Sequence, residues 1–182
     1  MQKRRHHGSH AVVSILGALT MEVKVVQGDL LEQNVDAILN AWNRSFIPWW
    51  LLLPQGVSGA IRKHAGTKPF REVGRFGVLK VGQAVFTSAG RLGYKGIIHV
   101  AGLNAFWRST ESSIRQSTRN AVDLVISKGF QTIAFPLIGA GTGGFKTQRV
   151  RELMLSEFSA IDSAIHATVV EFVRGNEMKS HK

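Results

Sequence analysis

Residues 132–145, TIAFPLIGAGTGGF, contain the feature that decides the fold: a buried apolar strand that runs directly into a glycine-rich loop. The pattern predicts a strand over residues 132–136, a loop over 137–145 and a helix from about Thr147 to Ile161. Four glycines within six positions let the backbone turn tightly and leave its N–H groups open to an anion. The N-terminus of the following helix adds a positive dipole end. We therefore expect a diphosphate to bind here, the alternative being a glycine-rich turn that serves only the geometry of the chain.

Two well-known phosphate motifs compete for this loop, and neither fits. Gly139, Gly141 and Gly144 match the spacing of the dinucleotide fingerprint, but that motif belongs to the first strand–helix unit of its fold, and only one strand follows here. The P-loop requires Gly-Lys-Ser/Thr, whereas Phe145 stands between Gly144 and Lys146.

Strands and helices alternate along the rest of the chain, which predicts an α/β sheet with helices on both faces. In such sheets ligands bind beyond the carboxyl ends of the strands, so the loops that follow strands are the informative ones. The other predicted strands cover residues 22–27, 36–40, 83–89, 96–101 and 167–173, and the other predicted helices cover residues 56–65 and 109–128.

The composition fits one domain, which we place at residues 21–182 after an N-terminal extension of residues 1–20. In the extension, Lys3, Arg4 and Arg5 precede a short, interrupted apolar run, as in a weak signal peptide. We instead expect the extension to be a tag-like or disordered segment. The chain has no cysteine, which excludes disulfides, thiolate metal sites and thiol catalysis. No apolar run is long enough for a membrane helix. We expect a cytoplasmic monomer without a metal or cofactor.

A formal net charge of +11 makes nucleic acid a possible partner, although the basic residues are dispersed along the sequence. Such an excess is more often a solvated surface than a polyanion site.

A second loop, residues 56–61 (GVSGAI), leads into the short helix 56–65 and again offers backbone N–H groups at a helix N-terminus. Together with the first loop it predicts a clamp on two phosphates. Asp29 follows the first strand and can accept a hydrogen bond from an adenine amino group. Asn40 and Asn43 follow the second strand with groups suited to ribose hydroxyls. Taken singly, each of these three residues is more often part of an ordinary turn.

In order, Gly28-Asp29-Leu30, VDAILNAWN at residues 35–43, GVSGAI at 56–61 and AFPLIGAGTGGF at 134–145 resemble the macrodomain family, and the match covers about residues 22–173. The resemblance implies a three-layer α/β/α sandwich with a central mixed sheet and ADP-ribose, free or attached to another molecule, in a cleft over the strand ends. It assigns adenine to Asp29 with Leu30, and the distal ribose side to Asn40, Asn43 and Phe145. It assigns the diphosphate to the two loops: Gly56, Val57, Ser58, Gly59, Ala60, Ile138, Gly139, Ala140, Gly141, Thr142, Gly143 and Gly144.

The chain departs from this family pattern at Ser58, where the commonest hydrolytic members have an aspartate that helps to position or activate water. Asn43 and Ser58 are the candidate catalytic residues, but a serine hydroxyl has no useful pKa near neutrality for a general base. His64, in the same helix, is a conceivable replacement. Three functions stay open: a hydrolase of the O-acetyl-ADP-ribose deacetylase or mono-ADP-ribosyl hydrolase type, a non-catalytic ADP-ribose reader, and a basic nucleic-acid-binding module.

The second departure is residues 44–55, which carry Trp49 and Trp50 in an apolar run. Such an apolar segment could pack onto the core, form a wall of the distal-ribose pocket or present a patch to a partner protein. We favour the pocket wall, since the segment joins Asn43 directly to the loop that begins at Gly56.

Overall fold

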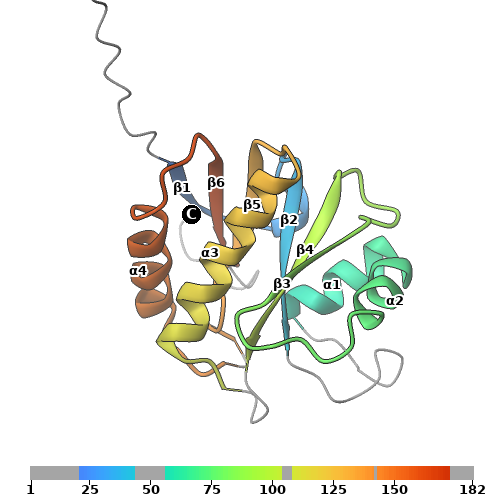
Figure 1. The fold of residues 1–182 in the computed structure, drawn as a ribbon, viewed down its shortest axis with the longest axis horizontal. Helices are drawn as coiled ribbons and strands as arrows, with labels where there is room; N and C mark the ends of the chain where they lie inside the picture. The colour runs from blue at the N-terminus through green and yellow to red at the C-terminus, as the bar shows by residue number, and fades with distance from the viewer. Residues whose placement is uncertain (1–20, 44–55, 104–107, 142, 173–182) are drawn as a thin grey trace, which may run out of the picture.

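A six-stranded mixed sheet forms the centre of the protein (Figure 1). The computed structural model describes residues 21–43, 56–103, 108–141 and 143–172, and of Asn43 the backbone alone. The strand order is β1-β6-β5-β2-β4-β3. The strands are β1 (Glu22–Gln27), β2 (Ala37–Asn43), β3 (Ala84–Thr87), β4 (Gly96–Leu103), β5 (Thr132–Pro136) and β6 (His166–Glu171).

Five of the six strands run parallel, and only β3 pairs antiparallel, with β4. Parallel strands are covered on both faces and therefore require apolar side chains on both. The central strands meet this condition, since Ala37, Ile38, Leu39, Ile133 and Phe135 are all fully buried. The mixed sheet that the sequence predicts is confirmed.

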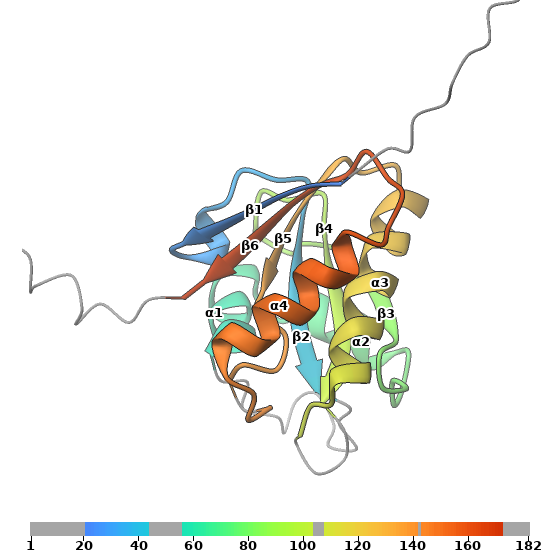
Figure 2. The same ribbon diagram turned by 90° about the vertical axis from the view of Figure 1, so that its left-hand side faces the viewer.

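Helices cover both faces of the sheet and complete three layers (Figures 1 and 2). One layer holds α3 and α4, whose buried side chains pack with Leu39 and Phe135. The other holds α1 and α2, whose buried side chains pack with Ile38 and Ile97. The helices are η1 (Leu30–Glu32, a 3-10 turn), α1 (Gly56–Ala65), α2 (Lys68–Gly74), α3 (Glu111–Ser127) and α4 (Thr147–Phe158).

The structure agrees with most predicted elements but differs at several bounds: β3 (Ala84–Thr87) is shorter than the predicted 83–89, and β6 ends at Glu171 rather than at residue 173. Strand β2 continues to Asn43, beyond the predicted end at Asn40. Helix α4 ends at Phe158 rather than Ile161, because the chain tightens into turns in which the Ile161 amide bonds to the Phe158 carbonyl, while the Ile161 side chain stays buried. Helix α2 was not predicted, although Pro69 near its start is a helix-initiation signal.

Candidate functional site

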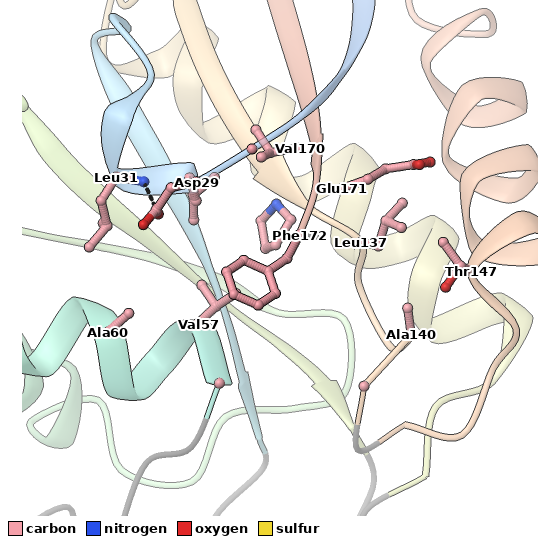
Figure 3. A pocket seen from close by; sticks show the side chains of 15 residues that line it. Asp29, Leu31, Val57, Ala60, Leu137, Ala140, Thr147, Val170, Glu171 and Phe172 are labelled. Atoms are coloured by element: carbon pink, nitrogen blue, oxygen red, sulfur yellow. Dashed lines mark hydrogen bonds between the residues drawn. The ribbon is translucent and has the colours of Figure 1, made fainter. Parts of the chain in front are cut away.

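A cavity of about 510 Å³ lies beyond the carboxyl ends of β1, β5 and β6, between the N-terminus of α1 and the glycine-rich loop (Figure 3). This is the place where open α/β sheets bind ligands, and the volume suits a nucleotide-sized molecule. Its lining is Gly28, Asp29, Leu30, Leu31, Gly56, Val57, Ala60, Pro136, Leu137, Ala140, Gly141, Thr147, Val170, Glu171 and Phe172.

Asp29 is held at one end of the cavity by the short η1 turn that follows β1. Its Oδ1 accepts a hydrogen bond of 2.8 Å from the amide of Leu31, which makes Asp29 the N-cap of η1. The Gly28 amide donates to the Glu171 carbonyl at 3.1 Å and ties this loop to β6. The carboxylate therefore has a fixed position on the cavity wall.

The wall beside Asp29 is apolar and carries an exposed aromatic ring. Phe172 directly follows β6, is 70% exposed and projects toward the α1 side of the cavity, near Val57 (Figure 3). An exposed flat ring can stack on a planar base. Phe172 was not a predicted site residue because the predicted strand ran to residue 173. The strand in fact ends at Glu171, which places Phe172 beyond its carboxyl end, where ligands of such sheets bind.

The N-terminus of α1 forms the second side of the cavity through Gly56, Val57 and Ala60. The first amides of a helix have no acceptor within the helix, and they carry the positive end of its dipole. The two predicted loops therefore border the same cavity, as the clamp hypothesis requires.

The glycines of the loop over residues 137–145 serve different purposes. A Cβ atom at Gly139 or Gly143 would collide with the Ser109 side chain, so these two glycines are required for packing. At Gly141 a Cβ would meet nothing within 4 Å, and Gly141 lines the cavity together with Ala140. Only part of the loop thus combines open space with access to a ligand.

The loop also uses some of the amides that were expected to be free. Ala140 donates to the Leu137 carbonyl at 3.3 Å, Gly144 to Gly141 at 3.2 Å and Phe145 to Gly139 at 3.2 Å. The prediction of freely available N–H groups is wrong for these three. The structure gives the Gly141 amide no acceptor among the described residues. An anion bound here would therefore be held mainly by Gly141 and the start of α1.

Eight of the predicted ligand-binding residues that the structure describes do not line the cavity: Asn40, Ser58, Gly59, Ile138, Gly139, Gly143, Gly144 and Phe145. The Ile138 side chain is fully buried in the core on the α3–α4 side. Thr142, the side chain of Asn43 and the predicted pocket wall over residues 44–55 lie outside the described part of the chain.

Asn40 and Ser58 belong to a chain of hydrogen bonds that runs into the sheet. Ser58 Oγ donates to Asn40 Oδ1 at 2.5 Å, and Asn40 Nδ2 lies 3.0 Å from His99 Nδ1. His99 Nε2 in turn lies 2.9 Å from Thr87 Oγ1, which donates to the Ser88 carbonyl at 3.1 Å. An amide nitrogen only donates, so the network assigns the proton of the ring to Nε2.

Burial lowers the pKa of His99 from 6.5 to about 3, so the ring stays neutral near pH 7. Both Asn40 and His99 are fully buried. The Asn40 side chain therefore links Ser58 to His99 inside the protein and does not line the cavity. His64 does not join this group, since it is exposed six residues further along α1 than Ser58, roughly 9 Å along the axis.

No cluster of three side chains suited to a metal ion occurs within the described ranges. The same ranges contain no helix that is both long and apolar enough to cross a membrane.

Comparison with known proteins gives a consistent result. The family model described as "Macro domain" matches residues 39–154. A macro domain-containing protein of Listeria monocytogenes serotype 4b is 35% identical over 162 residues, which cover 85% of this chain and 88% of that protein. A protein of Salmonella newport named O-acetyl-ADP-ribose deacetylase is 34% identical over 151 residues, covering 78% of this chain and 79% of the relative.

Solved structures show the same fold. The Oceanobacillus iheyensis macrodomain with ADP superposes with a TM-score of 0.71 at 26% identity, covering 85% of each chain. A variant of that macrodomain with ADPR gives 0.73, also at 26% identity, and covers 84% of this chain and 86% of the other.

Proposed function

The chain belongs to the macrodomain family, and from that premise we propose that it binds ADP-ribose or a derivative in the cavity between Asp29, the start of α1 and Gly141. One observation carries the proposal. The cavity presents, in order along its length, a fixed carboxylate beside an exposed aromatic ring, and then a helix N-terminus facing an open glycine loop. This order matches a base followed by a diphosphate.

The base end of the ligand is proposed to lie between Asp29 and Phe172. One oxygen of the Asp29 carboxylate caps η1, which leaves the group oriented as an acceptor for an exocyclic amino group such as that of adenine. The ring of Phe172 would stack on the base, and the apolar Val170 and Pro136 line the same region.

The diphosphate is proposed to lie across the first turn of α1, opposite Gly141. The amides of Gly56 and Val57 stand at the positive end of a ten-residue helix. Gly141 adds an amide from the other side without a side chain in the way. The distal ribose would then point toward Ser58, one residue after the cavity-lining Val57.

Hydrolysis at the distal ribose is a second candidate, favoured by relatives that are named O-acetyl-ADP-ribose deacetylase. Ser58 and Asn43 are the residues proposed to position a water molecule. Against an efficient reaction, the Ser58 hydroxyl is already donated to Asn40, and the neutral His99 behind it is a weak base because burial lowers its pKa to about 3. The geometry therefore supports binding better than turnover.

Calorimetry with ADP-ribose tests the binding proposal, and a turnover assay separates the two candidates. O-acetyl-ADP-ribose and a mono-ADP-ribosylated protein would be incubated with the chain. Release of acetate or ADP-ribose at the buffer rate would identify a reader, whereas catalysed release would identify a hydrolase.

We also propose that the protein is cytoplasmic and monomeric. The first point rests on the absence of cysteine, which suits a reducing compartment. Fractionation and gel filtration at micromolar concentration test both points, and recovery from a membrane or extracellular fraction would contradict the first.

A further inference from the structure

More than half of the formal charge of the protein comes from one stretch of the chain. Residues 56–91 contain seven lysines and arginines and a single acidic residue, Glu72, which gives a formal +6 out of +11. Glu72 is itself engaged, since its carboxylate accepts hydrogen bonds from the Ser88 amide at 2.7 Å and the Ser88 hydroxyl at 2.9 Å. The charges that look dispersed in the sequence are therefore concentrated on the α1–α2 layer.

The basic side chains of α2 share one side of the helix. Lys68, Arg71 and Arg75 follow each other at spacings of three and four residues, which places them in one stripe. All three are exposed, whereas Phe70 and Val73 bury the opposite side of the helix in the core. The amphipathic pattern thus turns a row of cations to solvent.

The end of α1 extends this row. Lys63 is exposed in the last turn, and the Arg91 guanidinium donates to the carbonyls of Lys63 at 3.0 Å and of His64 at 3.2 Å. Helices α1 and α2 lie side by side (Figure 1). Within the part of the chain that the structure describes, no carboxylate pairs with the members of this α1–α2 basic face, which are Lys63, Lys68, Arg71, Arg75 and Arg91.

We propose that the α1–α2 basic face binds the phosphodiester backbone of single-stranded nucleic acid. Phe76 follows Arg75 in the turn that ends α2 and is 53% exposed, so it offers an unpaired base a ring on which to stack. Cations beside an exposed aromatic ring favour a single strand over an acidic peptide or an anionic membrane, neither of which brings planar bases. This site is separate from the cavity, since none of its five members lines it.

The two sites are joined by α1. Its first residues border the cavity and its last turn carries Lys63, so the two sites stand roughly 10 Å apart along one helix. A strand bound to the basic face could present an ADP-ribosylated group to the cavity. Binding of the strand itself does not depend on the proposed ADP-ribose function.

The experiment measures fluorescence anisotropy of a labelled single strand of about 12 nucleotides at about 50 and 200 mM salt. The triple variant Lys68→Gln, Arg71→Gln, Arg75→Gln is expected to bind at least tenfold more weakly at low salt. The slope of log affinity against log salt should be less steep by about 2, because each of the three lost phosphate contacts contributes roughly 0.7 to it. A matched variant removes the same charge elsewhere and should bind like the wild type: Lys24→Gln, Lys128→Gln, Arg149→Gln.

Two further measurements make the outcome decisive. Phe76→Ala should weaken single-strand binding about tenfold and leave duplex binding unchanged. Thermal unfolding and ADP-ribose calorimetry on the basic-face variant should match the wild type, which separates failure of this site from failure of the cavity or the fold. No strand binding at low salt, equal losses in both triple variants, or tighter binding to polyglutamate or to phosphatidylserine vesicles would overturn the proposal.

Discussion

Ser58 Oγ donates a 2.5 Å hydrogen bond to Oδ1 of Asn40, which lies fully buried beneath it. The bond fixes the hydroxyl at the first turn of α1, and Asn40 is in turn held by His99. Asn40, His99 and Thr87 each donate one of these bonds and accept another. The direction can be reversed along the network if the Asn40 amide turns over and the ring proton of His99 moves to Nδ1. A hydroxyl at position 58 is compatible with either polarity of the network, whereas a group that can only accept would allow just one.

Ser58→Asp should reverse this polarity. A carboxylate at position 58 would only accept, so Asn40 would turn its NH₂ group outward and its Oδ1 toward His99, which must then carry its proton on Nδ1. Nitrogen NMR of the His99 ring should show Nε2–H in the wild type and Nδ1–H in the variant. If hydrolysis lacks only a base, the variant should also gain acetate release from O-acetyl-ADP-ribose by about 10²-fold or more. An unchanged tautomer would refute the network, and an unchanged rate would show that the missing base is not what limits hydrolysis.

Gly141→Val should abolish strong ADP-ribose binding without harming the fold. The position lines the cavity and has open space for a Cβ, and its backbone conformation is not one that disfavours side chains. We expect at least a tenfold rise in Kd, about 1.4 kcal/mol, with an unchanged Tm. Gly93→Val is the control, because Gly93 is also exposed and open but lies away from the cavity. Equal affinities for the two variants would count against the proposed diphosphate position.

Asp29→Asn should change which base is preferred. Asparagine caps a helix as well as aspartate does, so its Oδ1 can keep the bond to the Leu31 amide. Nδ2 would then face the ligand and place a donor opposite the amino group of adenine, while it would suit the oxygen of hypoxanthine. Wild type should bind ADP-ribose more tightly than inosine diphosphate ribose, and the variant should reverse this order in calorimetry. A variant that keeps the wild-type order would show that Asp29 does not contact the base.

The buried His99 should make stability depend on pH in mildly acidic solution. Its pKa is about 3 in the folded protein and 6.5 in the unfolded chain, so between these values the unfolded state binds the extra proton. The contribution is complete above pH 6.5 and is lost as the pH falls, at up to about 1.4 kcal/mol per pH unit. Urea unfolding from pH 6.5 to 4.5 should show this slope, and His99→Gln should remove it. Asp36, whose pKa is lowered to about 2 mainly by its hydrogen bond with Lys95, contributes only below this range.

The sequence predicted the fold well because its local signals agree with the global structure. Helix α1 has the predicted bounds at Gly56 and Ala65, and β5 has the predicted bounds at Thr132 and Pro136. Periodicity and glycine punctuation determine such elements locally. Helix α2 was missed because its seven residues are too short for a periodic pattern to stand out.

The site was predicted less completely because its details depend on contacts between distant segments. That Gly139 and Gly143 serve packing follows from Ser109, some thirty residues earlier in the chain. The burial of Asn40 follows from its bonds to Ser58 and His99. No local sequence pattern predicts which distant residues will be in contact. For the same reason, the sequence did not show that basic residues of two helices gather on one face.

Isothermal titration of the wild-type chain with ADP-ribose tests the central claim most directly. We predict saturable binding of one ADP-ribose per chain, competed by ADP and weakened at least tenfold in Gly141→Val. Absence of any heat of binding up to millimolar ADP-ribose, from protein shown to be folded by its thermal transition, would contradict the account.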